Sequence, residues 1–162
     1  MHSHPSRMEF NDFEKLTPAT VGAIRSLNKV IEESGLEKSL LELVKLRASQ
    51  LNGCAFCAQI HLNVARKHGV PAEKLDLAAV WRDAGIFSER EQAALAWTER
   101  LTLVAQQGVT DAAFQAAREQ FSELELANLS VAIGLINLWN RLGVAYAFPP
   151  PILHRPAAGS AA

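Results

Sequence analysis

Several features that mark other classes of protein are scarce or missing in this sequence. Its 162 residues include only two cysteines, too few for the disulfide framework of a small extracellular domain. Sixteen basic residues nearly balance seventeen acidic ones, which excludes the strongly basic surface of a nucleic-acid-binding protein. The N-terminus lacks the apolar core of a signal peptide, and no apolar run approaches the roughly 20 residues that cross a bilayer. We therefore expect a cytoplasmic protein that binds neither nucleic acid nor membrane.

The composition that is present is that of one globular domain. Hydrophobic residues make up 49% of the chain and charged residues 20%, values far from those of a disordered protein. A chain of this length buries enough apolar surface to fold without disulfides or a structural metal. We expect a single domain over residues 9–148, between an N-terminal tail at 1–8 and a proline- and alanine-rich C-terminal tail at 149–162.

Helix signals recur along this domain, whereas no alternation of apolar and polar residues is long enough to predict a strand. Thr17 and Pro18 supply an N-cap and a first-turn proline, and capping boxes begin at Ser88 and Ser122. The apolar segment after Ser122 predicts a central core helix or a subunit-interface helix. The sequence therefore predicts an all-α fold, a compact orthogonal bundle of about six to eight helices. The predicted helices are 18–34, 37–51, 54–68, a segment from Ser88 to Gly108, 110–120 and a segment from Ser122 onward, with short turns within 71–82.

The two cysteines, Cys54 and Cys57, lie three residues apart, just after the helix break at Asn52-Gly53. Cys54 should therefore occupy the first turn of the helix predicted over 54–68, with Cys57 one turn further along. This spacing puts both sulfurs on one helix face, near enough for a disulfide. Backbone N–H groups and the dipole at a helix N-terminus favour the thiolate over the thiol. The sequence thus predicts a redox motif at the N-terminus of a core helix.

A histidine and a glutamate are placed to act with the cysteine pair. His61 follows Cys57 by four residues and so shares its helix face, where it can exchange a proton with the sulfur. If the helices on the two sides of the break form an antiparallel hairpin, Glu42 and His61 both lie roughly 14 Å from the turn, at about 1.5 Å per residue. A carboxylate there would orient the imidazole, which gives a proton relay from Glu42 through His61 to Cys57. The other interpretation makes Glu42 a solvated residue paired with Lys38 or Lys45.

Metal binding is the main competing use of the motif. Cys54, Cys57 and His61 would supply three of the four ligands of a tetrahedral zinc site. His68, seven residues after His61, or a water would have to be the fourth. On this interpretation the protein is a non-enzymatic, zinc-binding or redox-sensing helical oligomer.

The order of these residues resembles a family signature. Glu42, eleven residues, Cys54, two residues, Cys57, three residues and His61 is similar to the E-x11-C-x2-C-x3-H pattern of the alkylhydroperoxidase D-like proteins in the carboxymuconolactone decarboxylase superfamily. The segments LRASQLNGCAFCAQIH and NLWNRLG also look like parts of this family's core and closing helix. The resemblance covers about residues 20–145 and is strongest over about 40–70.

The resemblance implies an all-helical protein that assembles as a homo-trimer or homo-hexamer and acts as a thiol-dependent peroxidase in antioxidant defence. Cys57 would be the peroxidatic thiolate, which attacks a hydroperoxide, and Cys54 the resolving cysteine, which closes the disulfide. Glu42 and His61 would form the proton relay. The resemblance implies no bound cofactor or metal. The reductant would be an external thiol, such as the dihydrolipoyl group of a carrier protein, and a peroxiredoxin would be a further redox partner.

One residue departs from the family's pattern. Founding members carry a second histidine between the two cysteines, where this chain has Phe56. The difference removes one proton donor and makes the surroundings of the pair more apolar. It leaves open that the family's scaffold acts here on another substrate.

Overall fold

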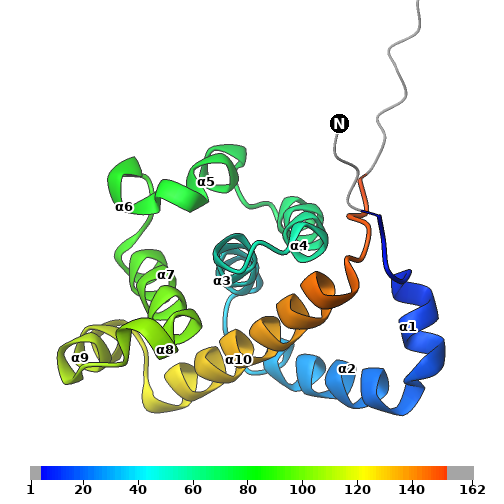
Figure 1. The fold of residues 1–162 in the computed structure, drawn as a ribbon. Coiled ribbons are helices and arrows are strands. Elements are labelled where there is room, and N and C mark those ends of the chain that lie inside the picture. The colour runs from blue at the N-terminus through cyan, green and yellow to red at the C-terminus, as the bar shows by residue number, and fades with distance from the viewer. Residues whose placement is uncertain (1–4, 153–162) are drawn as a thin grey trace, which may run out of the picture.

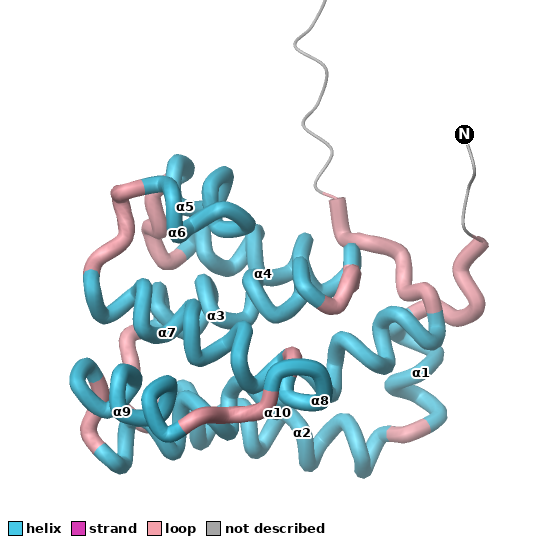
Figure 2. The backbone as a smooth tube through the Cα atoms, turned by 60° about the vertical axis from the view of Figure 1, so that its left-hand side comes forward, coloured by secondary structure: helices cyan, strands magenta, loops and turns pink. Residues whose placement is uncertain are grey.

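Helices follow the predicted segments along residues 5–152, the part of the chain that the computed structural model describes (Figure 1). These residues form helices joined by turns and loops, with no strand among them (Figure 2). The predicted all-α class is therefore confirmed. In order, the helices are α1 (Phe10–Leu16), α2 (Pro18–Glu32), α3 (Lys38–Leu51), α4 (Ala55–Lys67), α5 (Ala72–Leu77), the 3-10 turn η1 (Ala78–Val80), α6 (Trp81–Ala84), α7 (Glu89–Thr102), α8 (Val104–Gln107), α9 (Asp111–Gln120) and α10 (Glu123–Tyr146).

Short helices account for most of the differences from the prediction. The structure has α1 ahead of the first predicted helix, and its N-cap residue Glu9 makes no side-chain capping bond, so the sequence carries no start signal there. The predicted segment that ends at Gly108 is divided at Leu103 into α7 and α8. Helices α1, α6 and α8 have only seven, four and four residues. They raise the number of α-helices in residues 5–152 to ten, above the predicted six to eight.

The starts of the longer helices show which sequence signals are realised. Both predicted capping boxes, at Ser88 and Ser122, close the first turns of α7 and α10. In each box the serine hydroxyl oxygen accepts a hydrogen bond from the backbone N–H of the glutamate three residues later, and the side chain of that glutamate accepts one from the backbone N–H of the serine. Thr17 does not cap α2 as predicted, because its hydroxyl donates to the carbonyl oxygen of Phe13, 2.8 Å away in the preceding helix.

Helix α3 forms the centre of the molecule, with α4, α7 and α10 packed around it (Figure 1). Its sequence is apolar around most of its circumference, and nine of its fourteen residues are buried. Figure 1 looks nearly along the axes of α3 and α4, while α10 runs across the view, as expected of an orthogonal bundle. Each large apolar side chain buried in this way stabilises the fold by roughly 1.5–3 kcal/mol.

Helix α10, with 24 residues, is the longest in the described chain. It buries a face that includes Leu129 and Ile133 against α3 and α7, so it is a core helix, one of the two roles predicted for this segment. Within residues 5–152 no single helix has the length and hydrophobicity needed to cross a bilayer. Helices α9 and α10 meet these requirements only when counted together, and a bend of 114° separates them.

The segment that precedes α1 lies against the C-terminal end of α10 (Figure 1). The backbone N–H of Arg7 donates to the carbonyl of Tyr146 at 3.1 Å, and its guanidinium donates to the carbonyl of Ala145 at 2.8 Å. Phe13 of α1 packs edge-on against Phe148. The predicted tails at 1–8 and 149–162 are described only over 5–8 and 149–152, and their other residues lie outside the described part.

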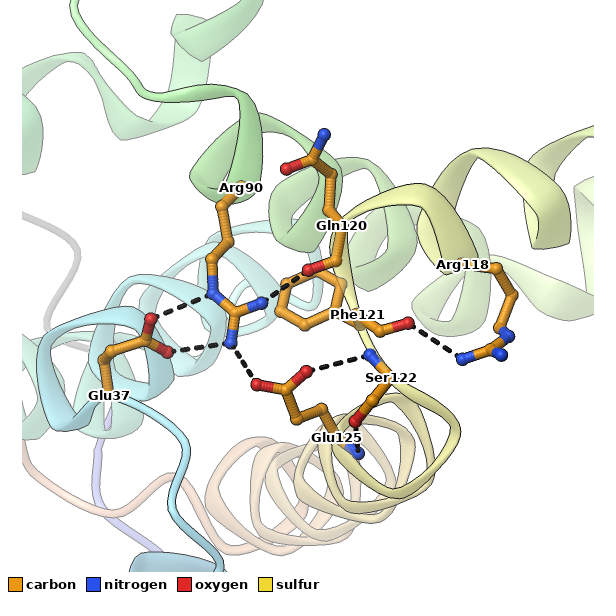
Figure 3. Close-up of polar contacts among 7 residues, drawn as sticks. All are labelled: Glu37, Arg90, Arg118, Gln120, Phe121, Ser122 and Glu125. Atoms are coloured by element: carbon orange, nitrogen blue, oxygen red, sulfur yellow. Dashed lines mark hydrogen bonds and ion pairs between the residues drawn. The ribbon is translucent and has the colours of Figure 1, made fainter.

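A cluster of charged side chains ties the starts of three helices together (Figure 3). The guanidinium of Arg90, on α7, donates to Glu37 at 2.9 and 3.2 Å and to Glu125 at 2.7 Å. Glu37 is the N-cap residue of α3, and Glu125 lies in the first turn of α10. The guanidinium also lies over the ring of Phe121, 4.3 Å from its centroid. Partial burial raises the pKa of Glu37, but the hydrogen bonds from Arg90 outweigh this effect and leave the pKa below its ordinary value.

We expect Arg90→Met to lower the free energy of unfolding by about 1–2 kcal/mol, because it removes hydrogen bonds to two partly exposed carboxylates. Urea denaturation at neutral pH measures this loss. The contribution of Glu37 is fully present above the ordinary pKa of a glutamate and is lost as the pH falls through its lower, folded-state pKa. The difference between variant and wild type should therefore shrink in acid. Arg100→Met, on the same helix, is the control, and an equal loss there would contradict the prediction.

Candidate active site

Cys54 and Cys57 form a disulfide at the start of α4, with their Cα atoms 5.4 Å apart. Cys54 is the N-cap residue of the helix, and its sulfur accepts a hydrogen bond from the backbone N–H of Cys57 at 3.2 Å. The two residues are almost fully buried, with 2% and 3% of their surfaces exposed. A reagent can therefore reach the sulfurs only through an opening in the protein.

The turn before the pair is fixed by a glycine and by a network of side-chain amides. Gly53 has a φ of +66°, in the left-handed region that glycine adopts without strain. The amide of Asn52 donates to the side-chain carbonyls of Asn137 and Asn140 on α10, at 3.0 and 2.9 Å. Asn140 is fully buried, and its amide donates in turn to the hydroxyl of Ser49 at 3.0 Å. These bonds hold the turn between α3 and α4 against α10 and so position the first turn of α4.

The backbone of α10 also passes very close to the cysteine pair. A Cβ atom added to Gly143 would lie 2.6 Å from the sulfur of Cys54 and 3.2 Å from that of Cys57, and both distances are shorter than an ordinary van der Waals contact. Sequence reasoning missed Gly143, although a glycine inside a helix weakens it relative to alanine and so signals a packing requirement. The signal is ambiguous, because Gly134 in the same helix would meet no atom within 4 Å.

The hairpin of α3 and α4 brings Glu42 and His61 into contact. Oε2 of Glu42 lies 2.7 Å from Nδ1 of His61, and Oε1 accepts a hydrogen bond from Nζ of Lys45 at 2.9 Å. The side chains of Glu42 and Lys45 are only 6% and 7% exposed, and that of His61 is 15% exposed. Both contacts considered for Glu42 from the sequence are therefore present. The lysine is Lys45 and not Lys38, and the pair is buried where the sequence interpretation made it solvated.

The environment of Glu42 decides its charge and the orientation of the imidazole. Burial raises the pKa of Glu42, but the hydrogen bond and charge of His61, followed by those of Lys45, outweigh this effect and hold the pKa below its ordinary value. An ionised carboxylate only accepts hydrogen bonds, so Nδ1 of His61 donates to it. The other ring nitrogen, Nε2, is then a proton acceptor whenever the imidazole is neutral.

A cavity of about 280 Å³ brings the reactive groups together. Its polar lining includes Glu42, Lys45 and His61, and of the two cysteines it is Cys57 that lines it. The remaining wall is mostly apolar and comes from α1, α2, α4 and α10. It includes Phe10, Ile31, Phe56, Ile60, Leu135 and Trp139. The cavity suits a small, largely apolar molecule whose reactive end meets Cys57.

Phe56, the residue that departs from the family's pattern, belongs to an aromatic cluster in the cavity wall. Its ring centroid lies 5.4 Å from that of Phe10 and 5.3 Å from that of Phe148. The ring centroid of Phe10 also lies 5.9 Å from that of Trp139. Helix α1 and the segment after α10 thus cover the side of the cysteine pair where the sequence suggested only a more apolar environment.

The structure does not assemble the zinc site considered from the sequence. Within residues 5–152, no group of three or more His, Cys, Asp and Glu side chains is arranged to hold a metal ion. His68 is the C-cap residue of α4 and Cys54 its N-cap residue, so the length of the helix, roughly 20 Å, separates them.

Comparisons with known proteins agree with the fold and the motif. The sequence profile of the carboxymuconolactone decarboxylase family matches residues 18–100. The uncharacterized protein YdfG of Bacillus subtilis is 32% identical over 133 residues, which make up 82% of this chain and 90% of that protein. The crystal structure of ATU0492, a protein of unknown function from Agrobacterium tumefaciens, has a TM-score of 0.86 and 36% identity, and the match covers 92% of this chain and 100% of that one.

A shorter match links the chain to a protein with a described activity. The alkyl hydroperoxide reductase AhpD of Rhizorhabdus wittichii is 44% identical over 50 residues, which make up 31% of this chain and 29% of that protein. The resemblance drawn from the cysteine motif is therefore confirmed. The chain belongs to the carboxymuconolactone decarboxylase family and, within it, to the AhpD-like proteins.

Proposed function

We propose that this protein is a thiol-dependent peroxidase of antioxidant defence, which reduces an organic hydroperoxide through its cysteine pair. The observation that carries the proposal is the cavity that Cys57 shares with the hydrogen-bonded Glu42 and His61. A thiol at a helix N-terminus, a base on the same helix and a carboxylate that orients the base are the parts of an activated nucleophile. The apolar walls favour an organic hydroperoxide over a fully polar substrate.

The first step consumes the peroxide. In the reduced protein, Nε2 of His61 accepts the thiol proton of Cys57, and the thiolate attacks the terminal oxygen of the hydroperoxide. A sulfur–oxygen bond forms as the oxygen–oxygen bond breaks, and the alkoxide takes the proton of the imidazolium and leaves as an alcohol. Cys57 remains as a sulfenic acid.

The second step closes the disulfide. The sulfur of Cys54, having lost its proton, attacks the sulfur of Cys57, and the hydroxide that leaves is protonated to water. One hydroperoxide and two thiols thus give one alcohol, one water and the disulfide. An external dithiol, such as a dihydrolipoyl group on a carrier protein or a thiol of a redox partner protein, restores the thiols by disulfide exchange. No bound cofactor enters these steps.

The proposed enzyme is a homo-trimer or homo-hexamer. Leu124, Val131 and Leu138 follow one another at seven-residue intervals along α10 and are 70%, 44% and 41% exposed. Apolar side chains in one exposed row are what a subunit interface would cover. Sedimentation-velocity ultracentrifugation should find a trimer or a hexamer, and a monomer at all concentrations would contradict the assembly.

We expect Cys57→Ser to abolish peroxide reduction, because it removes the attacking thiolate. The reduced protein is mixed with one equivalent of tert-butyl hydroperoxide, and the loss of free thiol is compared with that of free cysteine. Wild type should react at least about 100-fold faster than free cysteine, the scale on which a placed acid–base group acts. Mass spectrometry should identify the Cys54–Cys57 disulfide as the product.

Cys54→Ser is the matched control for this experiment. It keeps the attacking sulfur, so it should react once and leave Cys57 as a sulfenic acid without a disulfide. Full activity in Cys57→Ser would refute the role of Cys57 as the attacking thiolate, and wild-type thiols that react no faster than free cysteine would refute the peroxidase. The second result would favour a redox-sensing role, which the packing of both buried sulfurs against α10 supports.

Gly143→Ala should slow disulfide formation and lower the free energy of unfolding by about 1–3 kcal/mol, because the added methyl group overlaps both sulfurs. Gly134→Ala is the matched control on the same helix. Since its methyl group meets open space, it should raise the free energy of unfolding by about 0.5–1 kcal/mol. Urea denaturation and the thiol-loss assay measure both variants, and equal behaviour of the two would contradict the close approach.

A further inference from the structure

We propose that Lys45 is a positioning residue of the site, whose ammonium group offsets the charge of Glu42 and holds one oxygen of its carboxylate, so that the other oxygen orients His61 in the cavity that Cys57 lines. The inference rests on the proposed thiol chemistry, but it concerns a residue that the signature of the family does not contain. Lys45 would act through Glu42 rather than on the substrate.

The contact geometry supports this role. Lys45 follows Glu42 by three residues on α3, so the two side chains leave the same side of the helix. Nζ of Lys45 donates to Oε1 of Glu42 at 2.9 Å, while Oε2 faces Nδ1 of His61 at 2.7 Å. Each carboxylate oxygen therefore has its own partner. The side chain of Lys45 is 7% exposed, and a lysine is rarely buried to this extent unless it is paired.

The other charges along the cavity have partners of their own. Arg25 of α2 pairs with Glu14 of α1. Glu32, also on α2, accepts a hydrogen bond from the amide of Asn28 at 2.7 Å. The residues that α1 and α10 contribute to the cavity wall are uncharged. In the described part of the chain, the carboxylate of Glu42 thus contacts one lysine, on α3, and one histidine, on α4.

The charge balance gives Lys45 its function. A buried carboxylate is stable only beside a compensating positive charge. With Lys45 in place, that positive charge lies at Oε1, and Oε2 is left to accept the hydrogen bond of His61. Without Lys45, the negative charge of Glu42 is offset less fully, and a net negative charge at the cavity that Cys57 lines disfavours a further negative charge on its sulfur. The thiolate of Cys57 would then form only at a higher pH.

The test follows the thiolate directly and uses no peroxide. In a Cys54→Ser background, where Cys57 is the only thiol, the rate of alkylation by iodoacetamide is measured against pH. Lys45→Met should react about tenfold more slowly at neutral pH, equivalent to moving the profile by about one pH unit. Lys45→Arg keeps the charge and should restore the profile. Lys38→Met makes the same chemical change at an exposed position of the same helix and should leave the profile as it is.

A second background separates positioning from a direct effect on the sulfur. If Lys45 acts through Glu42, Lys45→Met should have no further effect once Glu42→Gln is present. An unchanged profile in Lys45→Met, an equal shift in Lys38→Met, or a tenfold effect that persists beside Glu42→Gln would each overturn the proposal. Should Lys45→Met not fold, Lys45→Gln takes its place in each comparison, because its amide can still donate to Oε1 of Glu42 but carries no charge.

Failure of this inference is distinguishable from failure of the proposed function. If the wild-type protein does not reduce hydroperoxide but its alkylation profile depends on Lys45 through Glu42, the peroxidase is refuted and the positioning role stands. If the protein is a peroxidase but Lys45→Met leaves the alkylation profile unchanged, the positioning role is refuted and the peroxidase stands.

Discussion

The arrangement of the site depends on one buried carboxylate, that of Glu42. It joins α3 to α4 through His61 and is balanced by Lys45. Because a carboxylate this far from water must keep its partners, the two helices are held in one register. Sliding α4 along α3 by one turn, about 5.4 Å, would leave the charge without its imidazole. The same contact that stabilises the hairpin therefore sets the orientation of the candidate base.

Helix α3 can present Glu42 accurately because both of its ends are fixed to α10. At its start, Glu37 is joined through Arg90 to Glu125 in the first turn of α10 (Figure 3). At its end, Asn52 is bonded to the side chain of Asn140 near the other end of α10. The long helix thus spans the distance between two polar attachments, and apolar packing fills the space between them. A rigid frame of this kind holds a reactive group better than a loop does.

The surroundings of the two sulfurs have opposing effects on the stability of a thiolate. The aromatic cluster around Phe56 and the close approach of Gly143 exclude water, and an apolar setting disfavours a thiolate. The first turn of α4 and the imidazole of His61 favour it. Both effects act on Cys57, which lines the cavity. Because Phe56 stands where the family's pattern has a histidine, stabilisation of the Cys57 thiolate depends more on the charged and polar groups of α3 and α4.

Local patterns in the sequence were sufficient to predict the all-α class, the capping boxes of α7 and α10 and the cysteine pair at the start of α4, because each depends on residues within a few positions of one another. The sequence also predicted that Glu42 and His61 lie at the same distance from the turn between their helices, because both helices rise by the same amount per residue. Only the tertiary structure decided the burial of Lys45, the contact of Gly143 with the sulfurs and the cover that α1 places over Phe56. Those features join segments far apart in the chain, and their energies depend on packing that no local spacing encodes.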